Sequence, residues 1–155
     1  KQAPDLGQVQ LEVVDIWHFG MSLLLREHTA DPASLAAHIC DAWSAPDPGL
    51  GVVAAAERVA AVAAGEQRFA VATFAALCAS AELSFDELFR LYLGKNVLNF
   101  FRQDNGYKEG TYHKVWAGRE DNEHLMEMLG EVDPGAEDAE ELLYKALSTR
   151  YAEST

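Results

Sequence analysis

The sequence has little that would place the protein in an oxidising compartment or in a membrane. Its two cysteines, Cys40 and Cys78, are far apart, so they form neither a Cys-x-x-Cys pair nor a disulfide framework. Both lie among apolar residues, which indicates core thiols. The uncharged stretch from Phe69 to Ala81 has only thirteen residues, too few to cross a bilayer. No signal peptide follows Lys1, and we expect a cytoplasmic protein.

Positive charge is also scarce. The chain has 12 Lys and Arg against 25 Asp and Glu, a net charge of −13, which argues against general binding to nucleic acid or to membrane surfaces. The five histidines contain no His-x-x-x-His pair, so zinc is not expected. Gly94-Lys95 is not a phosphate-binding P-loop, because Phe89 stands where the first glycine is needed and Asn96 where Ser or Thr is needed.

Strand patterns are missing as well. No stretch sustains an alternation of apolar and polar residues, and no internal repeat or low-complexity segment is present. At 155 residues we therefore predict one all-α domain, a multi-helix bundle of six or seven helices. Ser84-x-x-Glu87 is a capping box that begins one helix, Asn105-Gly106 is a stop signal that ends it, and Gly65 is expected to separate two others. The expected helices cover residues 8–27, 32–43, 50–65, 66–81, 84–105, 119–129 and 136–151.

The few cations gather in one segment. Between Arg90 and Arg119 lie six of the 12 Lys and Arg residues, two acids and four of the 11 glycines. Cations along a Gly-rich loop can close around a polyanion, because glycine lets backbone N–H groups approach phosphate oxygens. Lys95, Asn99 and Arg102 follow at i, i+4 and i+7, so they share one face of a helix. The alternative is a solvated helix end followed by a basic surface loop.

The first expected helix, Gln8–Glu27, is apolar nearly all round, so we predict that it is buried. Its Glu12 and Asp15 are neighbours at i and i+3. Two buried carboxylates cannot both stay ionised without compensation. A hard divalent cation such as Mg²⁺ can compensate them, because its preferred ligands are oxygens. The alternative is that this pair faces solvent or pairs with Arg26.

These two stretches resemble one family, the dimeric all-α dUTP diphosphatases (dUTPases) of trypanosomatids, Campylobacter and many phages. Glu12-Val13-Val14-Asp15-Ile16-Trp17-His18-Phe19 resembles the second acidic motif of that family. Its C-terminal nucleotide-closing motif is similar to Gly94-Lys95-Asn96-Val97-Leu98-Asn99, Phe101-Arg102-Gln103-x-Asn105-Gly106-Tyr107-Lys108-x-Gly110, Trp116-x-Gly118 and Glu120-Asp121-Asn122. The resemblance implies an all-α NTP pyrophosphatase fold, a single nucleotide-hydrolase domain over 1–155, and a phosphate-closing helix and loop over 91–122. Residues 29–84 carry no motif.

The resemblance further implies Mg²⁺-dependent hydrolysis of dUTP, and also of dUDP, to dUMP by a homodimer, with release of pyrophosphate or phosphate. Glu12 and Asp15 would be the catalytic acids and the Mg²⁺ ligands. His18, Phe19 and Asn99 would contact the uracil and deoxyribose. The phosphates would be bound by Lys95, Arg102, Tyr107, Lys108, Lys114 and Asn122.

One part of the family pattern has no counterpart here. The first acidic motif, Glu-x-x-Glu, and a uracil-binding first helix should precede Glu12 by more than the eleven residues present. We therefore expect an upstream helical portion that carries this motif, and we expect the chain without it to bind Mg²⁺ weakly and hydrolyse dUTP poorly. Two alternatives stay open: a related diphosphatase acting on another nucleoside triphosphate, and a helical interaction module that keeps the fold without turnover.

Overall fold

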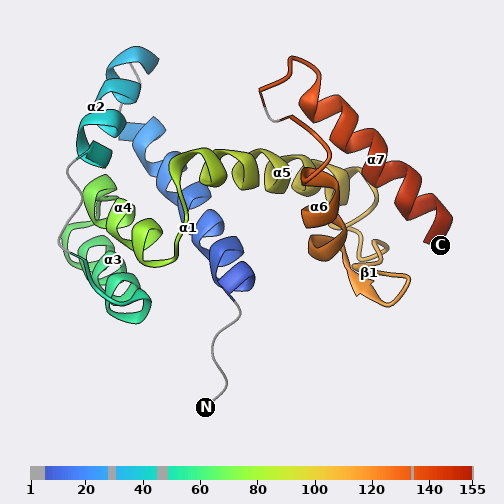
Figure 1. Ribbon diagram of the computed structural model, residues 1–155, viewed down its shortest axis with the longest axis horizontal. Coiled ribbons are helices and arrows are strands. Elements are labelled where there is room, and N and C mark those ends of the chain that lie inside the picture. Colours follow the sequence, from blue (N-terminus) through green and yellow to red (C-terminus); the bar gives the residue numbers. More distant parts are fainter. Residues whose placement is uncertain (1–5, 28–30, 45–48, 134, 155) are drawn as a thin grey trace. The chain divides into compact units, whose positions relative to one another are not determined.

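The structure is a computed structural model that describes residues 6–27, 31–44, 49–133 and 135–154. Within these residues it contains seven helices and one short hairpin (Figure 1). The all-α prediction is therefore confirmed. No helix of the described ranges is both long and apolar enough to span a membrane. The elements are α1 (Leu6–Glu27), α2 (Pro32–Ser44), α3 (Val52–Glu66), α4 (Val71–Ser80), α5 (Phe85–Asp104), β1 (Val115–Trp116), β2 (Arg119–Glu120), α6 (Asp121–Leu129) and α7 (Ala139–Ser154).

The chain divides into two compact units, Lys1–Leu88 and Phe89–Thr155. In the first unit α4 is the central helix and contacts α1, α2 and α3. An aromatic cluster fills this core: Trp17 of α1 stacks on Phe74 of α4 with ring centroids 5.2 Å apart, and Phe69 lies 5.3 Å from Phe74. Gly20 permits this packing, because a Cβ at that position would lie only 2.5 Å from the Phe69 ring.

The second unit is built around the C-terminal part of α5. Phe101 is 1% exposed and is surrounded by four aromatic rings at centroid distances between 5.5 and 6.3 Å. These rings are Tyr112, Trp116, Tyr144 and Tyr151. Gly94, in the middle of α5, is a packing position: a Cβ there would lie 2.5 Å from Leu129 of α6. Gly94 therefore allows α5 and α6 to pack closely against each other.

Local signals define both ends of α5, as predicted. The Ser84 hydroxyl accepts a hydrogen bond from the Glu87 N–H over 3.1 Å, which caps the first turn. At the other end Gly106 has a φ of 88°, and the Tyr107 N–H donates to the Arg102 carbonyl over 2.9 Å. This is the geometry of a glycine-terminated helix stop. The helix thus holds the predicted basic face in a fixed register.

Three local predictions are wrong. Gly65 lies inside α3, and the break follows at Gln67, whose φ is 53°. Cys40 is exposed, although Cys78 is a core thiol whose pKa is raised by burial to about 12. Helix α1 is buried on one side only, because its packing partners in the first unit cover residues such as Val14 and leave Phe19 exposed. The prediction of a fully buried helix from its apolar composition was therefore wrong for the side that carries Phe19.

Candidate active site

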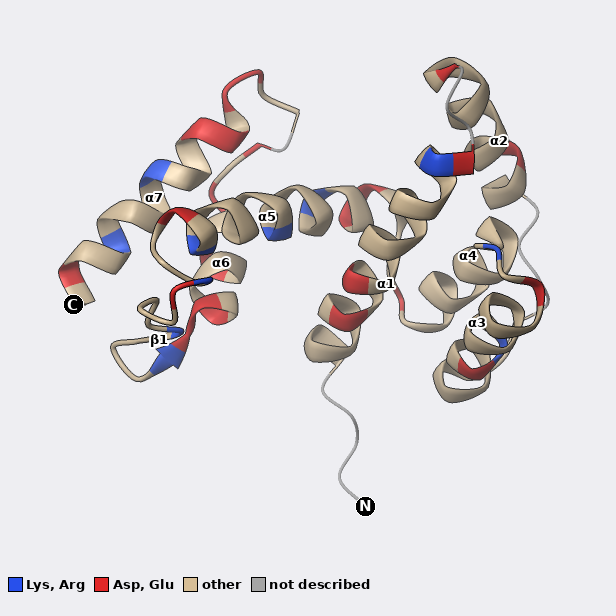
Figure 2. Ribbon diagram, turned by 180° about the vertical axis from the view of Figure 1, so that it is seen from behind, with Lys and Arg blue, Asp and Glu red and all other residues tan. Residues whose placement is uncertain are grey.

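The predicted acidic pair lies within a single turn of α1. Glu12 is exposed and Asp15 is half-buried, and Gln8 Nε2 donates a hydrogen bond to Glu12 Oε1 over 2.9 Å. Red segments of α1 in Figure 2 mark acidic residues. Glu12 therefore faces solvent, which was the alternative to a buried pair. Because Glu12 is not buried, its charge does not need a metal ion for compensation.

The donor chemistry of this pair still suits Mg²⁺. Among the described residues no group of three or more His, Cys, Asp or Glu side chains is arranged to hold a metal ion. Mg²⁺, however, is commonly held by one or two carboxylates, with water and substrate phosphates completing its ligand shell. Glu12 and Asp15 provide two hard oxygen donors of this kind. The residues present therefore fit Mg²⁺ as part of a ligand set.

His18 and Phe19 follow the acidic pair on the same helix. His18 is half-buried, and its Nδ1 lies 3.0 Å from the Val14 carbonyl oxygen. Because a carbonyl only accepts hydrogen bonds, Nδ1 carries the hydrogen, and this bond fixes the orientation of the ring. Phe19 has 75% of its surface exposed. An aromatic face of this kind can stack on a nucleobase.

The basic face of α5 lies in the second unit, where blue segments in Figure 2 mark Lys and Arg. Arg102 Nη1 donates to Asn99 Oδ1 over 3.3 Å, so the shared face predicted for these two residues is confirmed. Lys95, further back on the helix, has only 5% of its surface exposed. A lysine buried to this degree normally has a compensating partner, so Lys95 belongs to the packed side of the helix.

Arg102 is the centre of a buried network that the sequence did not indicate. Its Nη2 and Nε donate to the two carboxylate oxygens of Asp121, each over 2.8 Å. The Tyr112 hydroxyl donates to Asp121 Oδ2 over 2.9 Å. The side chain of Asp121 is 0% exposed and that of Arg102 is 13% exposed. The carboxylate of Asp121 therefore joins α5, the following loop and the first turn of α6.

Burial and charge act against each other at this network. Burial alone would lower the pKa of Arg102, but the hydrogen bond and the charge of Asp121 outweigh it and raise the pKa. Burial, followed by the Asp121 charge, raises the pKa of Tyr112 far above its ordinary value. Arg102 therefore stays cationic and Tyr112 stays a neutral hydrogen-bond donor across the physiological range.

The remaining predicted phosphate ligands lie on or after the loop. Tyr107 and Lys108 are exposed, and Lys114 Nζ forms an exposed ion pair with Glu120 Oε2 at 3.3 Å. Asn122 is half-buried, and its Oδ1 has no hydrogen-bond partner among the described residues. Tyr107, Lys108 and Lys114 leave polar atoms available to a ligand, and an exposed ion pair is easily exchanged for a phosphate contact. The Asn122 oxygen is buried and can only accept hydrogen bonds, so only the amide NH₂ of this residue could donate to a phosphate.

A hairpin holds the loop in place. The strands β1 and β2 are joined by Ala117 and Gly118, whose φ angles of 48° and 82° suit a tight two-residue turn. Trp116 is 1% exposed and stacks on His124 with ring centroids 5.2 Å apart. The Trp116 carbonyl lies 2.9 Å from His124 Nε2, which must therefore carry the hydrogen. The sequence did not indicate this hairpin.

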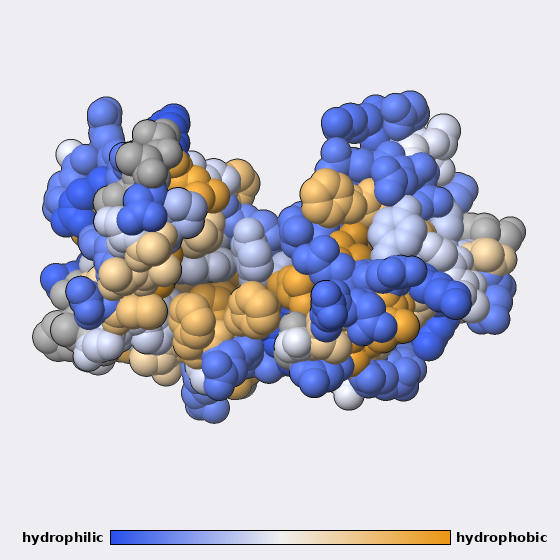
Figure 3. All heavy atoms as spheres, turned by 90° about the horizontal axis from the view of Figure 1, so that it is seen from above, coloured by the Kyte–Doolittle hydropathy of each residue, from blue (hydrophilic) through white to orange (hydrophobic). Residues whose placement is uncertain are grey.

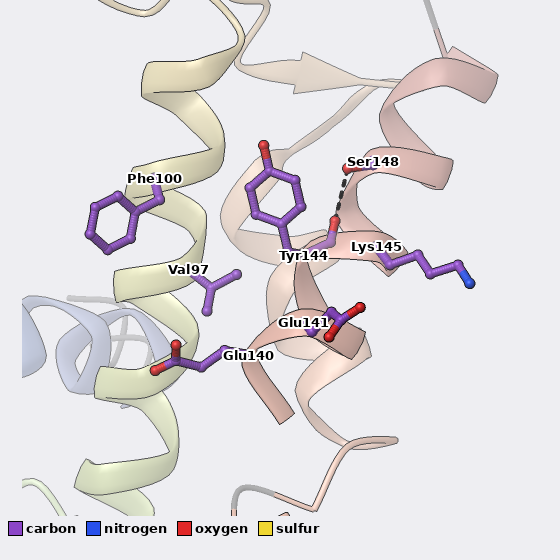
Figure 4. Close-up of a pocket in the computed structure, with 7 residues that line it drawn as sticks. All are labelled: Val97, Phe100, Glu140, Glu141, Tyr144, Lys145 and Ser148. Carbon is purple, nitrogen blue, oxygen red and sulfur yellow. Dashed lines mark hydrogen bonds between the residues drawn. The ribbon is translucent and has the colours of Figure 1, made fainter. Parts of the chain in front are cut away.

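A separate groove of about 580 Å³ lies between α5 and α7. Figure 4 shows Val97 and Phe100 of α5 opposite Tyr144 and Glu140 of α7. None of the predicted site residues lines it. Glu140 and Glu141 lie in the first turn of α7, where the helix dipole favours negative charge.

Apolar side chains also reach the surface among hydrophilic ones (Figure 3). On α1, Phe19 and Leu25 are 75% and 54% exposed, and on α5 Phe100 is 58% exposed. Scattered exposed apolar residues are common in proteins. Phe19 is distinguished from the others by its position next to His18 and the acidic pair.

The fold and the site define a class: an all-α protein with an acidic pair on one helix and a basic, Gly-containing helix–loop segment, as expected of a nucleotide hydrolase. A protein-family model described as dUTPase matches residues 1–107. The chain therefore belongs to the dUTPase family. No curated protein matches it in sequence.

Membership in this family makes the protein a hydrolase of nucleotide metabolism of the dUTPase type. The matched residues include the acidic pair on α1 and the basic face of α5, from Glu12 to Arg102 and Tyr107. Lys108 and Lys114 of the loop, the hairpin, and α6 with Asn122 lie beyond the match.

Proposed function

We propose that the protein hydrolyses dUTP, and also dUDP, to dUMP in an Mg²⁺-dependent reaction. The observation that supports this most directly is the dUTPase family match, which includes Glu12, Asp15 and the basic face of α5. Hydrolysis of a triphosphate depends mainly on positioning and on stabilisation of charge. A carboxylate pair suited to Mg²⁺ and an oriented arginine meet these needs.

The proposed roles follow the chemistry of each side chain. Glu12 and Asp15 would hold Mg²⁺, which when bound neutralises phosphate charge. His18 and Phe19 of α1, together with Asn99 of α5, would contact the uracil and the deoxyribose. The phosphates would be bound by Lys95, Arg102, Tyr107, Lys108, Lys114 and Asn122. Arg102 presents a planar, permanently charged donor group, which suits phosphate better than a point charge.

We further propose that residues 91–122 act as a phosphate-closing helix and loop within a single hydrolase domain. The loop after α5 contains exposed cations, and neutralisation of these cations by a triphosphate would draw the loop toward the ligand. Hydrogen exchange with and without a non-hydrolysable dUTP analogue and Mg²⁺ tests this. Increased protection of residues 105–120 is expected. Unchanged protection, with binding confirmed independently, would exclude closure.

The homodimer implied by the family resemblance is also part of the proposal. Exposed apolar residues on α1 outside the proposed base contact, among them Leu6 and Leu25, provide surface that a second copy could cover. Sedimentation velocity measures this directly. A species of twice the 17.0 kDa chain mass is expected, and a monomer at every concentration would contradict it.

A nucleotide panel tests the proposed activity. Pyrophosphate release from dUTP, dTTP, dCTP and UTP is measured with Mg²⁺ and with EDTA. We expect dUTP to be preferred and EDTA to abolish turnover. Equal turnover of all four would show a diphosphatase without uracil selectivity. Binding of dUTP without release of pyrophosphate would indicate a module that keeps the fold without catalysis.

A further inference from the structure

A buried carboxylate in the second unit has no assigned role in the proposed function. Asp121 is 0% exposed, and its two oxygens accept three hydrogen bonds, two from Arg102 and one from Tyr112. It is the first residue of α6, where the helix dipole also favours a negative charge. The carboxylate is therefore fully satisfied inside the protein and unavailable to a metal ion or a ligand.

A structural role alone explains this arrangement poorly. The loss of hydration of both ions opposes their attraction, so a buried ion pair often adds no net stability compared with apolar residues of similar size. A bidentate pair does have a geometric effect, because two parallel N–H···O bonds fix the plane of the guanidinium. At Arg102 both bonds are 2.8 Å long, so the plane of this side chain is defined by Asp121.

The fixed orientation of Arg102 leaves part of its guanidinium free of the bonds to Asp121 and Asn99. A guanidinium has five N–H hydrogens. Asp121 accepts two of them and Asn99 accepts a third over 3.3 Å. Two hydrogens, one on each Nη atom, are left after these three bonds, and the Tyr112 hydroxyl, whose own hydrogen goes to Asp121, also lies close enough to interact with the guanidinium. The side chain is 13% exposed although Asp121 is not exposed at all, so an anion can reach Arg102 but cannot reach Asp121.

We propose that Asp121 is a positioning residue that orients the Arg102 guanidinium so that its two remaining N–H groups bind the phosphate chain of the nucleotide. Tyr112 supports the same carboxylate from the loop. The inference rests on the proposed function in so far as that phosphate chain belongs to dUTP. An arginine held in its binding orientation loses little side-chain entropy when the phosphate arrives, which favours affinity.

A double-mutant cycle on Arg102→Ala and Asp121→Asn tests this, with inorganic triphosphate in the presence of Mg²⁺ as the calorimetric probe. Asp121→Asn should weaken triphosphate binding by about ten- to a hundredfold, the range for charged hydrogen bonds. In the Arg102→Ala background the same substitution should cause no further loss, because Asp121 acts through Arg102. Tyr112→Phe should follow the same pattern with a smaller effect. In kinetics, Asp121→Asn should lower kcat/KM for dUTP toward the value of Arg102→Ala.

Glu127→Gln is the matched control. Glu127 also lies on α6 and also pairs with two arginines, Arg119 at 3.0 Å and Arg150 at 3.4 Å, but it is exposed. It should change triphosphate binding less than about twofold, as expected for exposed ion pairs. If Asp121→Asn does not fold, Asp121→Glu replaces it, because it keeps the charge but moves the carboxylate by one methylene.

The outcomes separate this inference from the proposed function. Equal losses from Asp121→Asn in the presence and absence of Arg102 would overturn the positioning role, as would a wild-type protein that does not bind triphosphate. A wild-type protein that binds triphosphate with the expected coupling but does not hydrolyse dUTP would overturn the proposed function alone.

Discussion

Two acids of this protein show how the surroundings of a single residue decide its use. Asp121 is completely buried, and its charge is balanced inside the protein by Arg102. Glu12 is exposed and has Gln8 as a neutral hydrogen-bond partner at 2.9 Å. The charge of Glu12 is therefore available to an external cation, whereas that of Asp121 acts only on its neighbours. Substitutions at the two positions should differ accordingly.

For the acidic pair, we expect Glu12→Gln and Asp15→Asn each to lower Mg²⁺-dependent dUTP hydrolysis by at least about tenfold, since altered groups around metal sites typically cost ten- to a hundredfold. More Mg²⁺ should be needed for half-maximal activity. Glu57→Gln, an exposed acid on α3, is the control and should leave the Mg²⁺ titration unchanged. Full activity of both variants at ordinary Mg²⁺ concentrations would remove the pair from the metal site.

Tyr112 predicts a stability change at alkaline pH. Burial and the charge of Asp121 raise its pKa in the folded protein well above the ordinary value of 10.0. The unfolded chain therefore releases this proton at a lower pH than the folded protein does. The stability contributed by the neutral phenol is complete below about pH 10 and is lost as the pH rises further. Tyr112→Phe should accordingly flatten the fall of Tm above this pH, and parallel curves for the two proteins would contradict the expectation.

At the scale of elements, the local signals of the sequence predicted the limits of α5 but not the break after α3, which follows Gly65 at Gln67. Ser84 and Gly106 define the limits of α5 through short-range hydrogen bonds, which a sequence pattern can reveal. The hairpin has only two residues in each strand and a turn of Ala117 and Gly118, so it offers no alternating pattern and no Asn-Gly signal.

The candidate site was predictable only in part, and the reason is sequence separation. Lys95, Asn99 and Arg102 belong to one helix, so their spacing indicates a shared face. Asp121 lies 19 residues after Arg102, and no local pattern connects them. The family resemblance included Asp121 in a motif but gave no sign that it is a buried partner of Arg102. The outward face of α1 was missed because composition does not say which side of a helix is covered.

Replacing two helical glycines by alanine should change the free energy of unfolding in opposite directions, because only one of them is closely packed. Gly20→Ala should destabilise the protein by about 1–3 kcal/mol, because the new Cβ would lie 2.5 Å from the Phe69 ring. Gly65→Ala should stabilise it by about 0.5–1 kcal/mol, because it lies inside α3 with nothing within 4 Å of the new Cβ. Urea unfolding with unchanged m-values measures both. Stabilisation by both substitutions would show that helix propensity, and not contact with Phe69, governs position 20.

The whole molecule is strongly acidic, yet its family substrate is a polyanion. The net charge of −13 opposes the approach of a triphosphate, so in the proposed reaction the affinity would come from local cations and from a bound divalent cation. Nucleotide binding and Mg²⁺ binding would then be mutually dependent. Each ligand is expected to strengthen the binding of the other, because each offsets the charge that the other meets.

Thermal unfolding tests this dependence on the intact protein. A non-hydrolysable dUTP analogue with Mg²⁺, present at about 100 times its Kd, should stabilise the folded state by about 2.7 kcal/mol. Neither the analogue with EDTA nor Mg²⁺ alone should raise Tm by more than a small fraction of that effect. A full shift with the analogue in EDTA would show that phosphate binding does not need the cation.

The stack of Trp116 on His124 gives the second unit an optical signal of its own. The sequence has three tryptophans; the other two, Trp17 and Trp43, lie in the first unit with ring centroids 6.2 Å apart. The two rings are 5.2 Å apart, so the emission of this indole should change when the imidazole moves relative to it. With Trp17 and Trp43 replaced by phenylalanine, the emission intensity reports on the hairpin alone, and stopped-flow fluorescence can then time its response to a nucleotide.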